Sequence, residues 1–297
     1  MAAVTVLLNS TSGRAGLHGI DTRIATLFAT AGSRAEVHVL QRQEDVADAA
    51  RAAGTGGSIV VAAGGDGTVS QVASGVIDVN GILGILPLGT LNHFAKDLHL
   101  PLGLEEAIDT IASGRVGRVD VGQVNDRVFV NNASIGLYPS IVDVRDQLRR
   151  QGHRKWTAMA MATLRVLRRY RGMRMRIEVD GREHVWRTPF VFVGNNQYTV
   201  DGVSLGSRAS LNSGRLFVYL TPRVRTRHLP RLLLKAIAGR ASGSGDFEIL
   251  SGTTLRIDTL RPRRLLRVAF DGELARLAAP LHFRAWPGAL KVMLSRA

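Results

Sequence analysis

A glycine-rich turn with one carboxylate is the first stretch of this chain that could do chemistry. Residues 64–68 read GGDGT; they follow the apolar run 59–63 and precede residues 69–76, whose apolar positions have helical spacing. Glycine lets the backbone turn sharply and lets a ligand approach closely. The following helix offers free N–H groups and its positive dipole end to an anion. The pattern therefore indicates a phosphate site, although a turn capped by Asp66 or Thr68 would use the same residues.

Two carboxylates late in the chain could act on a hydroxyl group. Asp271 follows the apolar run 265–270, and Glu273 comes two residues later. In an extended segment both side chains would project from the same face. A carboxylate at this place can accept or orient a hydroxyl proton during phosphoryl transfer. Asp-Gly is also a favoured hairpin turn, and we predict such a turn at Asp180-Gly181.

The first part of the chain alternates strand and helix signals. Apolar runs predict strands at 4–8, 59–63 and 82–86, and residues 35–40 also read as a strand; helical spacing predicts helices near 24–28 and at 46–53, 69–76 and 104–111. This alternation is typical of a parallel sheet with helices on both faces. We therefore predict an α/β domain at residues 1–120 that binds a ligand beyond the carboxyl ends of its strands.

The second part of the chain has the period of β-strands. Short strands are predicted at 175–179, 190–193, 216–220, 254–257, 265–270 and 281–284, with helical insertions near 153–170 and 226–238. We predict a β-rich, antiparallel, sandwich-like domain at residues 121–284, and a return of about residues 285–297 to the first domain is left open.

Five stretches together resemble the diacylglycerol kinase catalytic family, which includes sphingosine kinases and bacterial lipid kinases. Besides GGDGT, residues 87–95 are similar to its P-x-G-T-x-N-x-F-A segment. Residues 9–13 resemble its first loop, N-P-x-S-G, residues 132–136 resemble N-x-x-S-x-G, and residues 271–273 match D-G-E. The stretches occur in family order and span nearly the whole chain. The NAD kinases share the GGDGT loop more distantly.

The resemblance implies a two-domain lipid kinase with an NAD kinase/diacylglycerol kinase-like α/β domain. It places ATP between the domains, with Asp66 near the triphosphate and its Mg²⁺, Asp271 as the base and Glu273 in support. The nucleotide contacts that it implies are Asn9, Ser10, Thr11, Ser12, Gly13, Gly64, Gly65, Asp66, Gly67, Thr68, Thr90 and Asn92. Thr90 and Asn92 could instead satisfy the backbone of their own turn.

The chain departs from the family pattern at three places. Ser70 and Gln71 stand where the family has Asn-Glu, and Ser10 stands where proline is usual. Asn212 and Ser213 stand where many bacterial members have the two carboxylates that hold a structural Mg²⁺. Because a hard cation prefers carboxylate oxygens, we do not expect that second metal site here.

Composition limits the class of protein. Hydrophobic residues make up 45% of the chain, enough for a sizeable core. The absence of cysteine excludes disulfides, cysteine zinc sites and thiol catalysis, and it fits a reducing compartment. No signal peptide and no apolar run of about 20 residues is visible. We therefore expect a cytoplasmic protein.

The net charge of +15 is concentrated in part around a predicted helix. Residues 145–176 contain eleven Lys and Arg residues and one acid, around the apolar stretch 156–164. Such a segment suits a helix on an anionic bilayer, here the inner membrane face. Alternatively, the helix packs on the sheet through Trp156, Met159, Leu164 and Leu167. No nucleic-acid-binding signature is present, and a homodimer is left open.

Three functions remain open from the sequence. The leading one is an ATP-dependent lipid kinase at the membrane surface. A soluble NAD kinase is disfavoured because residues 120–140 lack an Asn-Glu pair for the ribose. A sensor that binds nucleotide or lipid without transferring phosphate is motivated by Ser70, Gln71, Asn212 and Ser213, and the retention of Asp66, Asp271 and Glu273 argues against it. The lipid cannot be read from the sequence: diacylglycerol, a monoacylglycerol, phosphatidylglycerol and a sphingoid base all present a suitable hydroxyl.

Overall fold

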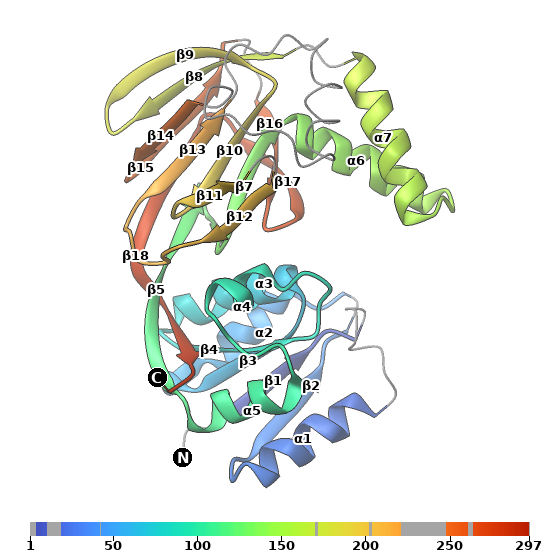
Figure 1. Cartoon of the computed structure of the whole chain (residues 1–297), viewed down its shortest axis with the longest axis vertical. Coiled ribbons are helices and arrows are strands. Elements are labelled where there is room, and N and C mark those ends of the chain that lie inside the picture. The colour runs from blue at the N-terminus through green and yellow to red at the C-terminus, as the bar shows by residue number, and fades with distance from the viewer. Residues whose placement is uncertain are drawn as a thin grey trace.

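The computed structural model describes residues 4–10, 19–41, 43–169, 172–201, 204–220, 248–260 and 264–296. It has an α/β half and a β-rich half, joined by long strands along one side (Figure 1). The fold class predicted from the sequence is confirmed. The helix predicted near 226–238 lies outside the described residues.

The α/β half is built on four parallel strands in the order β2-β1-β3-β4. The strands are β1 (Val4–Leu8), β2 (Ala35–Val39), β3 (Ile59–Gly64) and β4 (Ile82–Pro87). The helices are α1 (Ile20–Thr30), α2 (Val46–Ala53), α3 (Asp66–Asp78), α4 (His93–Asp97) and α5 (Leu104–Ser113), with a short 3-10 turn, η2 (Thr55–Gly57).

Strand β3 explains why this sheet is covered on both faces. All of its residues are buried, and successive side chains of a strand point to opposite faces. Val60 and Ala62 join the core that contains α2 and α3. Val61 and Ala63 join the core that contains α1 and α5. A continuous apolar run is what a parallel strand between two helical layers requires.

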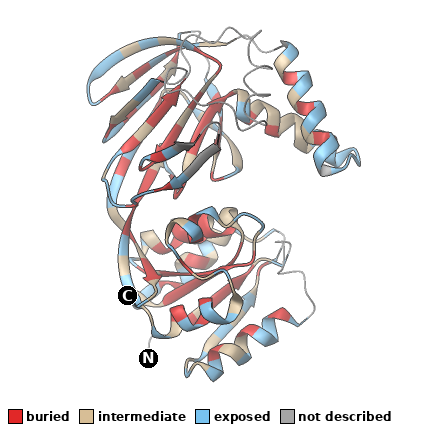
Figure 2. Ribbon diagram, in the orientation of Figure 1, coloured by how far each residue is buried: buried red, intermediate tan, exposed pale blue. Residues whose placement is uncertain are grey.

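The β-rich half consists of two antiparallel layers. A six-stranded sheet has the order β14-β13-β10-β7-β16-β17. It packs on the antiparallel part of the large sheet, and Val193 and Val218 of the first meet Ile177 and Ile257 of the second in one core. Figure 2 shows the buried residues concentrated between these layers.

The remaining strands have the following bounds. They are β5 (Arg115–Val124), β6 (Arg127–Phe129), β7 (Asn132–Gly136), β8 (Met173–Val179), β9 (Arg182–Thr188), β10 (Phe190–Asn195), β11 (Tyr198–Asp201), β12 (Ser204–Arg208), β13 (Leu216–Leu220), β14 (Glu248–Gly252), β15 (Thr254–Thr259), β16 (Leu265–Phe270), β17 (Glu273–Ala278) and β18 (Leu281–Leu294).

Strand β18 joins the two halves. It pairs with β15 and β5 in the β-rich half, and its residues Lys291 and Val292 pair in parallel with β4. The sequence predicted a strand at 281–284 only. The strand continues because Pro287 and Gly288 lie in an irregularity of the ladder, between Trp286 and Leu290, instead of ending it.

Two helices, α6 (Leu137–Arg150) and α7 (Lys155–Arg169), project from the β-rich half. The sequence predicted the second and missed the first. Helix α7 packs on α6 through Ala158 and Ala162, which contact Leu148. Trp156 is 80% exposed and Leu164 is 51% exposed, so the alternative in which α7 packs on the sheet is wrong for these two residues.

Helix α3 is held tightly against α2 at Gly75. A Cβ atom at this position would lie 2.2 Å from the carbonyl oxygen of Ala47 and 2.7 Å from Cβ of Ala50. We expect Gly75→Ala to destabilise the protein by about 2 kcal/mol, because overpacking outweighs the better helix propensity of alanine. Urea unfolding measures this. Ser74→Ala, on the neighbouring position, should change stability by less than about 0.5 kcal/mol, and equal effects of the two would contradict the packing argument.

Candidate active site

Two loops meet at the carboxyl edge of the parallel sheet. The GGDGT segment leads from β3 into α3, and residues 88–92 lead from β4 into α4. The N–H groups of Leu88 and Gly89 both donate to the carbonyl of Gly64, at 3.1 Å. A Cβ atom on Gly89 would lie 2.4 Å from Cα of Gly65. The two backbones therefore touch, which only glycine permits.

Polar side chains fix the shape of these loops. Asn9, directly after β1, donates from Nδ2 to Oγ1 of Thr68 at 3.0 Å. Oδ1 of Asp66 accepts from the N–H of Phe94 at 3.1 Å. Asn92 has a φ of 51° and donates from Nδ2 to the carbonyls of Pro87 and Gly89. The amide nitrogen of Asn92 thus satisfies the backbone of its own turn.

Of the other predicted nucleotide contacts, Ser10 and Thr90 lie in the described part of the chain. Ser10 and Thr90 are both exposed, and both lie in loops at this edge of the sheet. Thr11, Ser12 and Gly13 lie outside the described residues.

The acidic turn at residues 271–273 comes from the β-rich half. Asp271 and Gly272 have φ values of 46° and 89° and connect β16 to β17. Asp180 and Gly181, with φ values of 45° and 84°, connect β8 to β9 in the same way. The predicted hairpin turn at 180–181 is confirmed, and both Asp-Gly pairs supply the positive φ values that a tight hairpin requires.

Asp271 is buried and accepts four hydrogen bonds. Oδ2 accepts from Oγ of Ser70 at 2.6 Å and from the N–H of Val130 at 2.7 Å. Oδ1 accepts from the N–H groups of Asn131 and Asn132, at 2.8 and 3.0 Å. Burial raises the pKa of Asp271, and the hydrogen bonds act in the opposite direction. The carboxylate therefore ties the loop 130–132 and helix α3 to the turn.

Glu273 is partly buried and lies against the GGDGT loop. Its Oε1 accepts from Nε2 of Gln71, and a Cβ atom on Gly67 would lie 3.4 Å from the same oxygen. Burial raises the pKa of Glu273, and the charge of Asp271 raises it further. The Gln71 hydrogen bond and the charge of Arg127 oppose this rise.

The sequence did not predict the partners of these acids. Ser70 and Gln71 are consecutive residues of α3 and bind Asp271 and Glu273, about 200 positions away in the chain. The sequence marked both residues only as departures from the family pattern. The sequence did show their position: both residues lie near the start of the helix that begins within GGDGT, close to the predicted phosphate site.

A buried arginine links the two halves a second time. Arg208 of β12 pairs with Asp97 of α4, with Nε 2.7 Å from Oδ2 and side-chain exposures of 0% and 6%. It also donates to the carbonyls of Val130 and Asn195 and to Oδ1 of Asn131. The guanidinium lies over the rings of Phe94 and Tyr198.

These contacts form a closed ring around the site. Asp66 of α3 contacts α4, and Asp97 of α4 pairs with Arg208. Arg208 binds the loop 130–132, and that loop binds Asp271. Asp271 accepts a hydrogen bond from Ser70 of α3, which closes the ring. Asn131 and Asn195 also lie in this ring, through their contacts with Arg208. The glycine loop and the acidic turn are therefore positioned by one network.

The positions of the family's structural metal ligands carry neutral contacts. Ser213 donates from its N–H and from Oγ to Oδ1 of Asn196, at 2.8 and 2.6 Å. The nearby carboxylate of Asp120 accepts from the N–H groups of Gly214 and Gly288. The described part of the chain contains no group of three or more His, Asp or Glu residues that could hold a metal ion.

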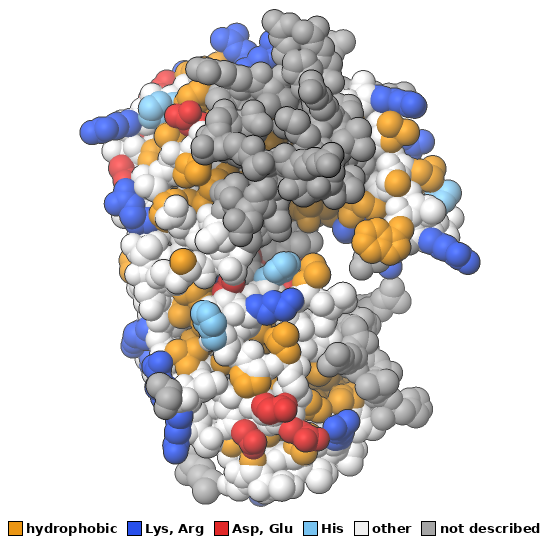
Figure 3. Space-filling view, viewed as in Figure 1, with side chains coloured by type: hydrophobic (Ala, Val, Ile, Leu, Met, Phe, Trp, Pro, Cys, Tyr) orange, Lys and Arg blue, Asp and Glu red, His pale blue; other side chains and the backbone are white. Residues whose placement is uncertain are grey.

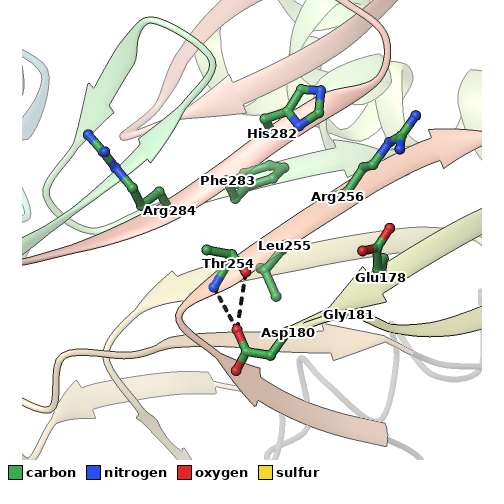
Figure 4. Close-up of a pocket in the computed structure, with 9 residues that line it drawn as sticks. All are labelled: Glu178, Asp180, Gly181, Thr254, Leu255, Arg256, His282, Phe283 and Arg284. Carbon is green, nitrogen blue, oxygen red and sulfur yellow. Dashed lines mark hydrogen bonds between the residues drawn. The ribbon is translucent and has the colours of Figure 1, made fainter.

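A pocket on the outer face of β8, β15 and β18 is separate from these loops (Figure 4). It is lined by Glu178, Asp180, Gly181, Thr254, Leu255, Arg256, His282, Phe283 and Arg284. Asp180 accepts hydrogen bonds from Thr253 and Thr254, and these bonds lower its pKa. The carboxylate is thus used to hold the turn between β14 and β15.

Helices α6 and α7 carry exposed apolar and basic side chains together. Trp156, Met161 and Leu164 are exposed large hydrophobic residues. The exposed basic residues are Arg149, Arg150, Arg154, Arg165 and Arg168. Figure 3 shows hydrophobic and basic side chains gathered on this projection, above a recess between the halves. No helix in the ranges that the structure describes is long and apolar enough to cross a membrane.

Comparisons with known proteins agree with this architecture. The family model described as "Diacylglycerol kinase catalytic domain" matches residues 3–124. The model described as "YegS C-terminal NAD kinase beta sandwich-like domain" matches residues 134–294, more than half of the chain.

Relatives and a solved structure are similar to the chain over different lengths. A diacylglycerol kinase of Staphylococcus saprophyticus is 34% identical over 134 residues, 44% of each chain, so this match spans less than half of that relative. A diacylglycerol kinase of Bacillus subtilis is 28% identical over 245 residues, 80% of each chain. A crystal structure of a diacylglycerol kinase from Bacillus anthracis has a TM-score of 0.71 at 20% identity and covers 99% of this chain and 97% of that one, which shows a shared fold.

The two matched domains follow each other along the chain, at residues 3–124 and 134–294. The chain belongs to the diacylglycerol kinase catalytic-domain family, with a YegS-type β-sandwich domain following the catalytic domain.

Proposed function

We propose that this protein transfers the γ-phosphoryl group of ATP to a hydroxyl group of a lipid. One observation carries the proposal: the acidic turn of the β-rich half contacts the helix that follows the GGDGT loop, through Ser70 and Gln71. An anion site and carboxylates that can receive a hydroxyl proton thus lie together, which is the arrangement that phosphoryl transfer needs. Relatives named diacylglycerol kinase support a lipid as the acceptor.

In this proposal the nucleotide lies on the loops at the edge of the parallel sheet. The N–H groups at the start of α3 face the phosphates, with Asn9 and Thr90 at the flanks of the site. Asp66 fits a Mg²⁺ carried by ATP, since only one of its oxygens is engaged by a described donor, the N–H of Phe94. When bound, Mg²⁺ would neutralise charge on the phosphates.

The acidic turn receives the hydroxyl proton in this proposal. Asp271 is the base that the family resemblance implies. To accept a proton it must first release one of its four donors, of which Ser70 is the only side chain. Glu273 supports it from the GGDGT side of the turn.

The two alternative functions are less well supported. The sensor was motivated by Ser70 and Gln71, but these residues bind the two acids and so preserve the acidic turn. The NAD kinase would need an acidic residue beside Asn131 and Asn132, and the hydrogen bonds of these residues go instead to Arg208 and Asp271.

We further propose that α6 and α7 dock the protein on an anionic membrane, at the inner face. The exposed apolar residues lie beside exposed arginines, a combination that favours binding at a charged bilayer surface. A kinase whose acceptor stays in the bilayer needs such a contact.

Trp156→Ala is expected to weaken binding to anionic vesicles roughly tenfold, because an indole that enters the interface is lost. Vesicle sedimentation at low and high salt measures this. Trp286→Ala, on β18, is the control and should leave binding unchanged. Equal binding of wild type and Trp156→Ala would count against docking through α7.

The function is tested by incubating the protein with γ-labelled ATP and vesicles that contain one candidate acceptor each, with NAD in a parallel reaction. We expect label in one lipid and none in NADP, and loss of label in Asp66→Ala. Label only in NADP would favour the NAD kinase, and ATP binding without any labelled product would favour the sensor.

A further inference from the structure

The two acids of the 271–273 turn differ in how many of their oxygens are already bound. Asp271 accepts four hydrogen bonds, which fill the roughly four lone-pair positions of a carboxylate. Among the described residues, Glu273 accepts one hydrogen bond, at Oε1. Its Oε2 is therefore the oxygen of this turn that a hydroxyl group could reach without displacing a described donor.

Glu273 lies against one face of helix α3. A Cβ atom on Gly67 would lie 3.4 Å from Oε1, an ordinary van der Waals distance, so this oxygen lies directly beside Gly67. Gln71 lies four residues further along α3, hence on the same face of the helix. Its amide donates to the same Oε1. The hydrogen bond from Gln71 engages Oε1 and leaves Oε2 without a described donor.

We propose that Gln71 is a positioning residue, which holds Glu273 so that Oε2 faces the acceptor hydroxyl, and that Glu273 takes the proton of that hydroxyl. This inference rests on the proposed function. In the transfer step, the hydroxyl oxygen forms a bond to the γ-phosphorus and the bond from phosphorus to the β–γ bridging oxygen breaks. The proton moves to Oε2, and ADP leaves with the electron pair of the broken bond. In this step Asp271 is the anchor of the turn, and Glu273 takes the place of the base that the family resemblance assigns to Asp271.

Four variants test whether the contact positions a catalytic acid or only joins two domains. Gln71→Leu removes the donor at similar volume. Gln71→Glu places two carboxylates against each other, and Glu273→Gln removes the acid. The double variant Gln71→Glu/Glu273→Gln restores a carboxylate–amide hydrogen bond with the two partners exchanged. Gln41→Leu, at an exposed residue shortly after β2, is the matched control. Each is measured for kcat, for KM of ATP and of lipid, and for Tm.

We expect Gln71→Leu to lower kcat about tenfold with both KM values within twofold of wild type, and Gln41→Leu to change nothing. Glu273→Gln should lose about 100-fold or more in kcat. The exchanged double variant should recover the Tm that Gln71→Glu loses, yet remain as inactive as Glu273→Gln.

Recovery of kcat by the exchanged variant would show that the contact is only a domain latch and would overturn the inference, as would a wild-type kcat in Gln71→Leu. If wild type itself transfers no phosphate, the proposed function fails, and the proton-accepting role of Glu273 fails with it. The Tm series would still report whether Gln71 and Glu273 are in contact.

Discussion

Asp271→Asn is expected to lower phosphate transfer at least about 100-fold and to destabilise the protein by about 3 kcal/mol. The buried carboxylate accepts three backbone N–H groups and one hydroxyl. An asparagine amide would direct N–H groups at backbone donors, so that at least one of them would lose its acceptor. The turn would then be displaced from α3, and Glu273 with it. Urea unfolding and the transfer assay measure the two effects.

Asp180→Asn is the matched control for this variant. Asp180 occupies the same turn position and also accepts backbone N–H groups, from Thr253 and Thr254, but it is exposed and lies on the outer sheet face. We expect Asp180→Asn to destabilise the protein by about 1 kcal/mol and to leave the transfer activity unchanged. If Asp271→Asn kept more than about a third of the wild-type rate, the role given to the acidic turn would be wrong.

Arg208→Gln is expected to destabilise the protein by about 3–5 kcal/mol, because it leaves the carboxylate of Asp97 buried without its charged partner. The pair is almost fully buried, with side-chain exposures of 0% and 6%. The loop 130–132 would lose the same side chain as a donor. Transfer activity should fall as well, since that loop holds Asp271.

An exposed ion pair provides the comparison. Arg23 and Glu105 are 3.1 Å apart, with side-chain exposures of 58% and 63%, and Glu105→Gln should cost less than about 1 kcal/mol. Replacing both partners, in Arg208→Met/Asp97→Leu, should recover much of the stability lost in Arg208→Gln. A cost below about 1 kcal/mol for Arg208→Gln would show that the pair does not join the two halves as described.

The α/β half was predictable because its signals are local. Residues 46–53 were predicted as a helix with the bounds that α2 has, because apolar spacing acts within a few residues. In the structure Asp45 caps this helix by accepting from the N–H groups of Ala47 and Asp48. The start of β3 and the glycine turn after it follow from one apolar run and the residues that end it. Local patterns of this kind do not depend on distant parts of the chain.

The features that the sequence missed depend on long-range contacts. Strand β18 continues past Pro287 because β5 pairs with it on both sides of the irregularity. The partners of Asp271 and Glu273 are about 200 residues away, and a single sequence contains no information on which distant side chains meet. The sequence showed that Ser70 and Gln71 differ from the family pattern, but only the fold shows that they bind Asp271 and Glu273.

The most direct test of the account is to measure both products of one reaction. Wild-type protein is mixed with γ-labelled ATP and anionic vesicles that contain the best acceptor, and ADP and labelled lipid are quantified over the first turnover. We predict one labelled lipid for each ADP, with both products lost in Glu273→Gln. ADP formed without labelled lipid, or labelled lipid formed equally by Glu273→Gln, would contradict a lipid kinase whose acid comes from the 271–273 turn.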